Sequence, residues 1–217
     1  MTKINNKRKI IQLIMWPILF GIGQIFICGI FILINYLTVN ISNEIFLDNM
    51  MMIIVIAECL LFIPLFCFLY KNYKGKPKYC SYKKIILLSF FSIFLSIGLN
   101  YIIIKLKQLF GLNLICDSIN MNIILSTGVI GPIIEELLYR GIVYGSMKTY
   151  MSDKIAFYLS VCVFAFSHVG DLFQIIFAFV VGLYLTAIYR KYNNIYLVMF
   201  FHILVNVSSI LVSCYLI

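Results

Sequence analysis

Three charged residues lie close together in an apolar stretch of the sequence, GPIIEELLYRG, which runs from 131 to 141. They are Glu135, Glu136 and Arg140. A charge at the centre of a lipid bilayer costs about 2.5 to 3.5 kcal/mol even on the most lenient insertion scale. Ionisable groups inside a membrane span are therefore candidates for function, and a carboxylate there can act as a general base.

Helical spacing separates the three charges. Glu136 and Arg140 are four residues apart and share one helix face, so they can form an ion pair, whereas Glu135 points about 100° away from Glu136. We therefore predict that Glu135 carries the chemistry and that the other two support it. Gly131 and Pro132 are expected to kink or restart the helix, because proline lacks a backbone donor. Such a break would let water and an extended substrate reach the carboxylate.

Two further apolar stretches carry an imidazole, and one of them also carries an amide. With about 1.5 Å of rise per helical residue, the carboxylate lies about 20 Å and the first imidazole about 21 Å from the nearest flanking lysine. The second imidazole and the amide lie about 16 and 23 Å from their flanking lysine. These candidates are Glu135, His168, and His202 with Asn206. Their common depth predicts that they gather at one level of the membrane.

The second imidazole and the amide suit a specific task. His202 and Asn206 are four residues apart, so one helix face offers two hydrogen-bond donors, as an oxyanion hole requires. Phe164 precedes His168 by one turn and could wall the site. Taken singly, each histidine is also explained as an interhelical hydrogen-bonding residue, and the Glu136–Arg140 pair as a structural ion pair.

The composition indicates where these residues lie. The chain has 217 residues, of which 63% are hydrophobic and 12% charged, and its mean hydropathy is +1.04. Soluble domains use about 45 to 50% apolar residues, and a membrane-crossing helix needs about 20 in a row. We predict one all-α integral membrane domain, 1–217, forming a helical bundle of about seven (six to eight) spans around an intramembrane polar cavity. The predicted spans are Ile10 to Val39, Met50 to Tyr70, Ile85 to Ile104, Met121 to Met147, the short Ala156 to Val169, Leu172 to Tyr189, and Ile195 to Ile217.

The charges between the spans predict the orientation. With the N-terminus in the cytoplasm, fourteen basic residues lie inside and only Lys105 and Lys107 lie outside, as the positive-inside rule favours. We expect a multi-pass protein of the plasma membrane that contacts the lipid bilayer and no nucleic acid, because the net charge of +9 is spread over loops. The seven cysteines show no metal-ligand spacing and indicate no redox compartment.

Three motifs follow in order, and together they resemble those of the CPBP intramembrane proteases, also called the Abi family, which includes the type II CAAX prenyl endopeptidases. They are Glu135-Glu136-x-x-x-Arg140, Phe164-x-x-x-His168 and His202-x-x-x-Asn206. The resemblance covers about 121 to 207, which we take as the catalytic core. It implies a helical bundle around a water-accessible cavity that hydrolyses a peptide bond of a membrane-associated peptide or protein precursor.

The resemblance also implies a role for each residue. Glu135 and His168 would position and activate water, and His202 and Asn206 would stabilise the oxyanion. The residues that would support them are Glu136, Arg140 and Phe164. Since no HExxH helix is present, we favour a mechanism without a cofactor, although zinc on Glu135, His168 and His202 is an alternative.

Two non-proteolytic interpretations stay open. The first is a membrane protein that binds without catalysis, such as a bacteriocin self-immunity factor, since immunity is a role attached to this family. The second is a proton-coupled carrier that uses Glu135 and the histidines as a relay, although this sequence lacks the internal symmetry expected of carriers. The sequence leaves the substrate and the oligomeric state open.

Overall fold

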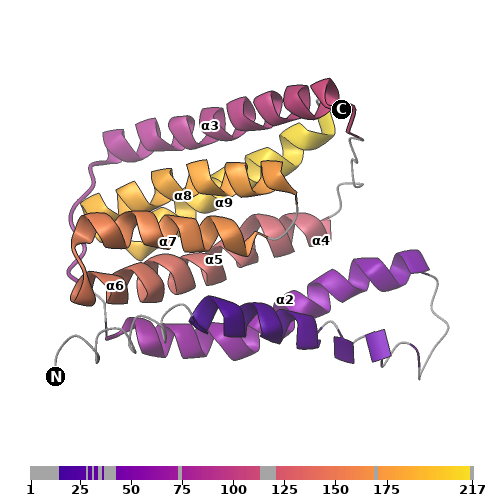
Figure 1. Ribbon diagram of the computed structural model, residues 1–217, viewed down its shortest axis with the longest axis horizontal. Coiled ribbons are helices and arrows are strands. Elements are labelled where there is room, and N and C mark those ends of the chain that lie inside the picture. The colour runs from indigo at the N-terminus through magenta and orange to yellow at the C-terminus, as the bar shows by residue number, and fades with distance from the viewer. Residues whose placement is uncertain are drawn as a thin grey trace. The chain divides into compact units, whose positions relative to one another are not determined.

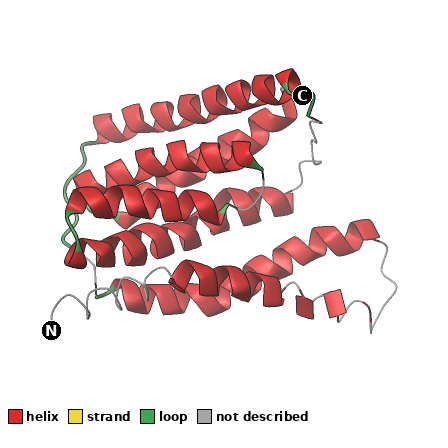
Figure 2. Ribbon diagram, in the orientation of Figure 1, coloured by secondary structure: helices red, strands yellow, loops and turns green. Residues whose placement is uncertain are grey.

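The computed structural model describes residues 15–27, 29–30, 32–33, 36, 43–72, 75–112, 121–168 and 171–215, and these residues contain helices and loops but no strand (Figure 2). This confirms the predicted all-α fold. After a first helix, Met15–Ile27, the elements are α2 (Asn43–Tyr70), α3 (Tyr82–Leu109), α4 (Met121–Ile123), η1 (Ile124–Ile130), α5 (Gly131–Glu136), η2 (Leu137–Tyr144), α6 (Gly145–Tyr150), α7 (Asp153–Ser167), α8 (Leu172–Tyr192) and α9 (Ile195–Tyr215). The elements labelled η have π-helical geometry, with wider turns.

Length and composition make this an integral membrane protein. Among the described residues, four helices are long and apolar enough to cross a bilayer, namely Tyr82–Leu109, Met121–Tyr150, Leu172–Tyr192 and Ile195–Ser213. Met15–Ile27 and Val55–Tyr70 are shorter apolar helices. Large apolar side chains such as Phe94 and Leu87 are exposed, whereas Ser96, Glu136 and Arg140 are buried. This inverts the pattern of a soluble protein and suits a lipid environment.

The chain divides into two compact units, each built from two chain segments. The first unit comprises Met1–Lys74 and Ile134–Ser167, and the second comprises Gly75–Ile133 and His168–Ile217. We describe each unit by itself. The single membrane domain expected from the sequence stays a prediction.

In the second unit, α3, α8 and α9 are long neighbouring helices (Figure 1). A polar stripe with helical spacing on α3 connects them. Ser92 Oγ lies 2.8 Å from Tyr184 Oη of α8, Ser96 Oγ donates to the Val205 carbonyl of α9 at 2.9 Å, and Asn100 Nδ2 donates to Ser209 Oγ at 2.9 Å. Because apolar packing alone gives little specificity between helices in lipid, these hydrogen bonds set how α3 and α9 pair.

The end of α3 and the start of α8 are joined by an ion pair. Lys107, near the end of α3, pairs with Asp171, the N-cap of α8, at 2.6 Å. Burial alone would raise the pKa of Asp171, but the Lys107 ammonium and the Gln174 backbone N–H outweigh it and hold this pKa below its usual value. At the other end, the Lys78 N–H donates to the Tyr192 carbonyl at 2.7 Å.

In the first unit, α2 packs against η2 at a glycine. A Cβ on Gly141 would lie 2.9 Å from Cδ2 of Tyr70, so only a residue without a side chain allows this approach. The GxxxG spacing of Gly141 and Gly145 predicts such a contact. Phe62 of α2 also meets Phe20 of the first helix edge to face, with ring centres 4.9 Å apart.

Candidate active site

The first motif lies in the middle of one continuous helix, Met121–Tyr150. We expected a kink or a restart at Gly131 and Pro132, and the chain stays helical through both residues. Instead its geometry changes: η1 ends with the Gly131 N–H donating to the Ser126 carbonyl, five residues earlier. The wider turn accommodates the missing N–H of Pro132, so the helix continues through α5 into η2. π-Helical turns inside α-helices are frequent at functional sites.

Glu136 and Arg140 form a buried ion pair in the first unit. Arg140 Nη1 donates to Glu136 Oε1 at 2.8 Å, and the two side chains are 1% and 0% exposed. The i, i+4 spacing therefore produces the pairing that it predicts. Arg140 also interacts electrostatically with Glu135, which is the less buried carboxylate of the two. One guanidinium thus serves both carboxylates.

Phe164 packs against the first motif. Its ring lies against the Arg140 guanidinium, with Cζ 4.1 Å from the ring centre, and meets the Tyr139 ring edge to face at 5.1 Å. Phe164 and Tyr139 are both buried. The aromatic face supplies a cation–π interaction that helps Arg140 to remain charged without water. The contact of Tyr139 with Phe164 was not predicted from the sequence, although Tyr139 directly precedes Arg140 within the first motif.

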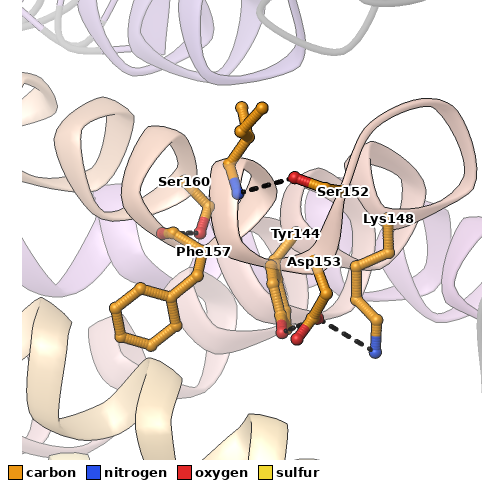
Figure 3. Close-up of polar contacts among 7 residues, drawn as sticks. Tyr144, Lys148, Ser152, Asp153, Phe157 and Ser160 are labelled. Carbon is orange, nitrogen blue, oxygen red and sulfur yellow. Dashed lines mark hydrogen bonds and ion pairs between the residues drawn. The ribbon is translucent and has the colours of Figure 1, made fainter.

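Polar contacts close the turn between α6 and α7 (Figure 3). Tyr144 Oη donates to Asp153 Oδ1 at 2.7 Å, and Lys148 Nζ lies 3.9 Å from the same oxygen. Ser152 Oγ accepts the N–H of Ile155 at 3.4 Å and caps the first turn of α7. These contacts fix the start of α7, the helix whose other end carries the second motif.

His168 lies just beyond the helix in which we expected it. The predicted span reached Val169, but α7 ends at Ser167, and the half-buried His168 is the next residue. The 15 residues of α7 rise about 22 Å, less than the roughly 30 Å of a hydrocarbon core. If α7 starts at the membrane surface, His168 therefore remains at membrane depth.

His202 and Asn206 lie one turn apart on α9, in the second unit. His202 is 2% exposed, and Asn206 is partly buried. Asn206 Nδ2 donates to the carbonyl of Thr127 at 3.0 Å, and the neighbouring Val205 carbonyl accepts the Ser96 hydroxyl. Sequence reasoning missed Thr127 and Ser96, although the polar spacing along α3 could have revealed the second.

The candidate residues are thus divided between the two units. Glu135, Glu136, Arg140 and Phe164 belong to the first unit, and His168, His202 and Asn206 belong to the second. The predicted gathering of Glu135 with the histidines and Asn206 stays a prediction. Within the described part of the chain, no group of three His, Cys, Asp or Glu side chains is placed to hold a metal ion. Metal dependence also stays a prediction.

The fold and these residues define a helical membrane protein with ionisable groups buried within its spans. Residues 118–208 match the family model described as type II CAAX prenyl endopeptidase Rce1-like. The matched segment contains all three motifs, which confirms the resemblance seen in the sequence.

A curated relative gives a second match. UPF0177 protein YxdF of Lactococcus lactis subsp. lactis strain IL1403 is 34% identical over 67 residues, which are 31% of this chain and 36% of that protein. The matched segment therefore spans about a third of the relative's length. No solved structure matches the chain.

Proposed function

We propose that this protein is an intramembrane endopeptidase that hydrolyses a peptide bond of a membrane-associated peptide or protein precursor. The observation that carries the proposal is the Rce1-like match over 118–208, within which a buried Glu136–Arg140–Phe164 stack adjoins Glu135. Ionisable groups are costly in a membrane span and are therefore functional candidates, so this stack supports a reactive role for the carboxylate beside it.

In the proposed reaction, Glu135 takes a proton from a water molecule while the oxygen of that water attacks the scissile carbonyl carbon. His168 orients the water. The negative charge on the carbonyl oxygen is stabilised by His202 and Asn206. When the C–N bond breaks, the proton held by Glu135 passes to the leaving amine. Glu136 balances the charge of Arg140, which also interacts electrostatically with Glu135.

We propose that these residues work without a metal ion and that the protein lies in the plasma membrane with its N-terminus in the cytoplasm. The distribution of basic residues supports this orientation. Zinc analysis of the purified protein tests the first point. Stoichiometric zinc, with activity lost to a chelator and restored by the metal, would contradict it.

The decisive experiment is a product analysis with the purified protein in proteoliposomes. A mixture of membrane peptides, with and without a prenyl group, is incubated in water enriched in oxygen-18, and new C-termini are identified by mass spectrometry. We expect one oxygen-18 atom in each new carboxylate and about 100-fold or more less product with Glu135→Gln. Glu58→Gln, the same change on α2 outside the matched segment, serves as the control. Equal cleavage by wild type and a folded Glu135→Gln variant would refute the proposal.

A further inference from the structure

The carbonyl of Thr127 lacks a backbone donor because of the two residues that open α5. In an α-helix this carbonyl would accept the N–H of residue 131, and in a π turn it would accept that of residue 132. The Gly131 N–H donates to Ser126 instead, and Pro132 has no N–H. Both helical patterns therefore leave the Thr127 oxygen available to a donor from outside the helix.

The donor comes from α9, 79 residues later in the chain. Asn206 Nδ2 lies 3.0 Å from the Thr127 oxygen. Gly128 allows the close approach, because a Cβ there would lie 3.1 Å from Val207 and 3.3 Å from Ile210 of α9. A side-chain amide has two N–H groups, so the bond to Thr127 uses one and fixes the direction of the other.

We propose that Pro132 is a positioning residue that orients the Asn206 amide through the Thr127 carbonyl. The bond to the Thr127 carbonyl joins two helices and takes up one N–H of the Asn206 amide, so it sets the orientation of that amide. Its second N–H then points in a set direction before any substrate binds. The catalytic consequence rests on the proposed function, in which this N–H is one of the oxyanion donors and gains from being fixed in advance.

The kinetic test compares Pro132→Ala with Asn206→Ala and with the double variant. Alanine at 132 restores an N–H that competes with Asn206 for the Thr127 carbonyl. We expect kcat to fall by up to about 100-fold with KM unchanged, because the donor is displaced but the substrate-binding surface is retained. In the Asn206→Ala background, Pro132→Ala should have no further effect. Pro64→Ala, which restores an N–H inside α2, is the matched control and should leave kcat unchanged. Independent, multiplicative losses would overturn the proposal.

A second measurement does not require activity. In nitrogen-15 spectra of protein labelled on asparagine, the Asn206 side-chain signal is assigned by its loss in Asn206→Ala. We expect one of its two protons to be shifted downfield in the wild type, and the shift to disappear in Pro132→Ala. An ordinary Asn206 signal in the wild type overturns the proposal even if Pro132→Ala does not fold. If the wild type shows this shift, Pro132→Ala loses it and no peptide is cleaved, the proposed function fails while the link between Pro132 and Asn206 stands.

Discussion

Replacing Arg140 by methionine would remove a guanidinium that is buried between a carboxylate and an aromatic ring. The guanidinium lies 2.8 Å from Glu136 Oε1, with both side chains at most 1% exposed, and 4.1 Å from the centre of the Phe164 ring. Methionine is unbranched and adapts to irregular spaces, so the substitution removes the charge and its hydrogen bond while leaving little void.

The expected loss follows from the stranded carboxylate. Removing one partner of a buried ion pair costs about 3 to 5 kcal/mol, since the remaining charge lies in a low dielectric without compensation. We expect Arg140→Met to lower the free energy of unfolding by that amount. Replacing a whole buried pair by apolar side chains is often neutral or stabilising. The double variant Glu136→Leu with Arg140→Met should therefore recover most of the loss.

The free energy of unfolding can be measured by titrating the purified protein with a denaturing detergent in mixed micelles. Lys84→Met, at an exposed position near the start of α3, is the control and should change it by less than about 0.5 kcal/mol. A loss below about 1 kcal/mol for Arg140→Met, the scale of a surface pair, would refute the reasoning. So would a double variant that is no more stable than the single one.

Activity should respond differently from stability. Arg140 also interacts electrostatically with Glu135, so the double variant changes the surroundings of the proposed base. We therefore expect the double variant to recover most of the stability and still to cleave poorly. Full activity in that variant would show that the Glu136–Arg140 pair serves the fold alone.

Two further predictions concern packing and the membrane surface. Gly141→Ala should destabilise the protein by about 1 to 3 kcal/mol, because its Cβ would lie 2.9 Å from the Tyr70 ring. Gly98→Ala is the control and should not destabilise it, because a Cβ there has no neighbouring atom within 4 Å. Equal thermal midpoints of the two variants would contradict this. Asp171→Asn keeps the helix cap and loses only the bond to Lys107, worth about 0.2 to 1 kcal/mol, whereas Asp171→Ala loses both. Since the folded state lowers the pKa of Asp171, its contribution is present at neutral pH and is lost as the pH falls through that lowered pKa. Thermal midpoints of wild type and both variants between pH 7 and roughly pH 3 test this, and an unchanged difference across that range would contradict it.

The sequence predicted the helices well because hydropathy and length are local properties. Each of the seven predicted apolar runs contains a helix in the described residues. The helix ends were predicted less accurately: the predicted span reached Val169, but α7 ends at Ser167. Where a helix ends inside a membrane depends on the protein that surrounds the chain there, which is not a local property of the sequence. The single domain and the full catalytic set stay predictions.

By itself, the sequence determined that the chain spans a membrane and that Glu136 and Arg140 share a face, because both depend on the regular geometry of one helix. Only the tertiary structure decided which ring covers Arg140 and which carbonyl receives the Asn206 amide. These partners come from other helices, α7 and η1, and the second contact joins positions 79 residues apart. In lipid, helices associate through close approach at small residues and through hydrogen bonds between buried polar groups, which periodicity along a single helix does not encode.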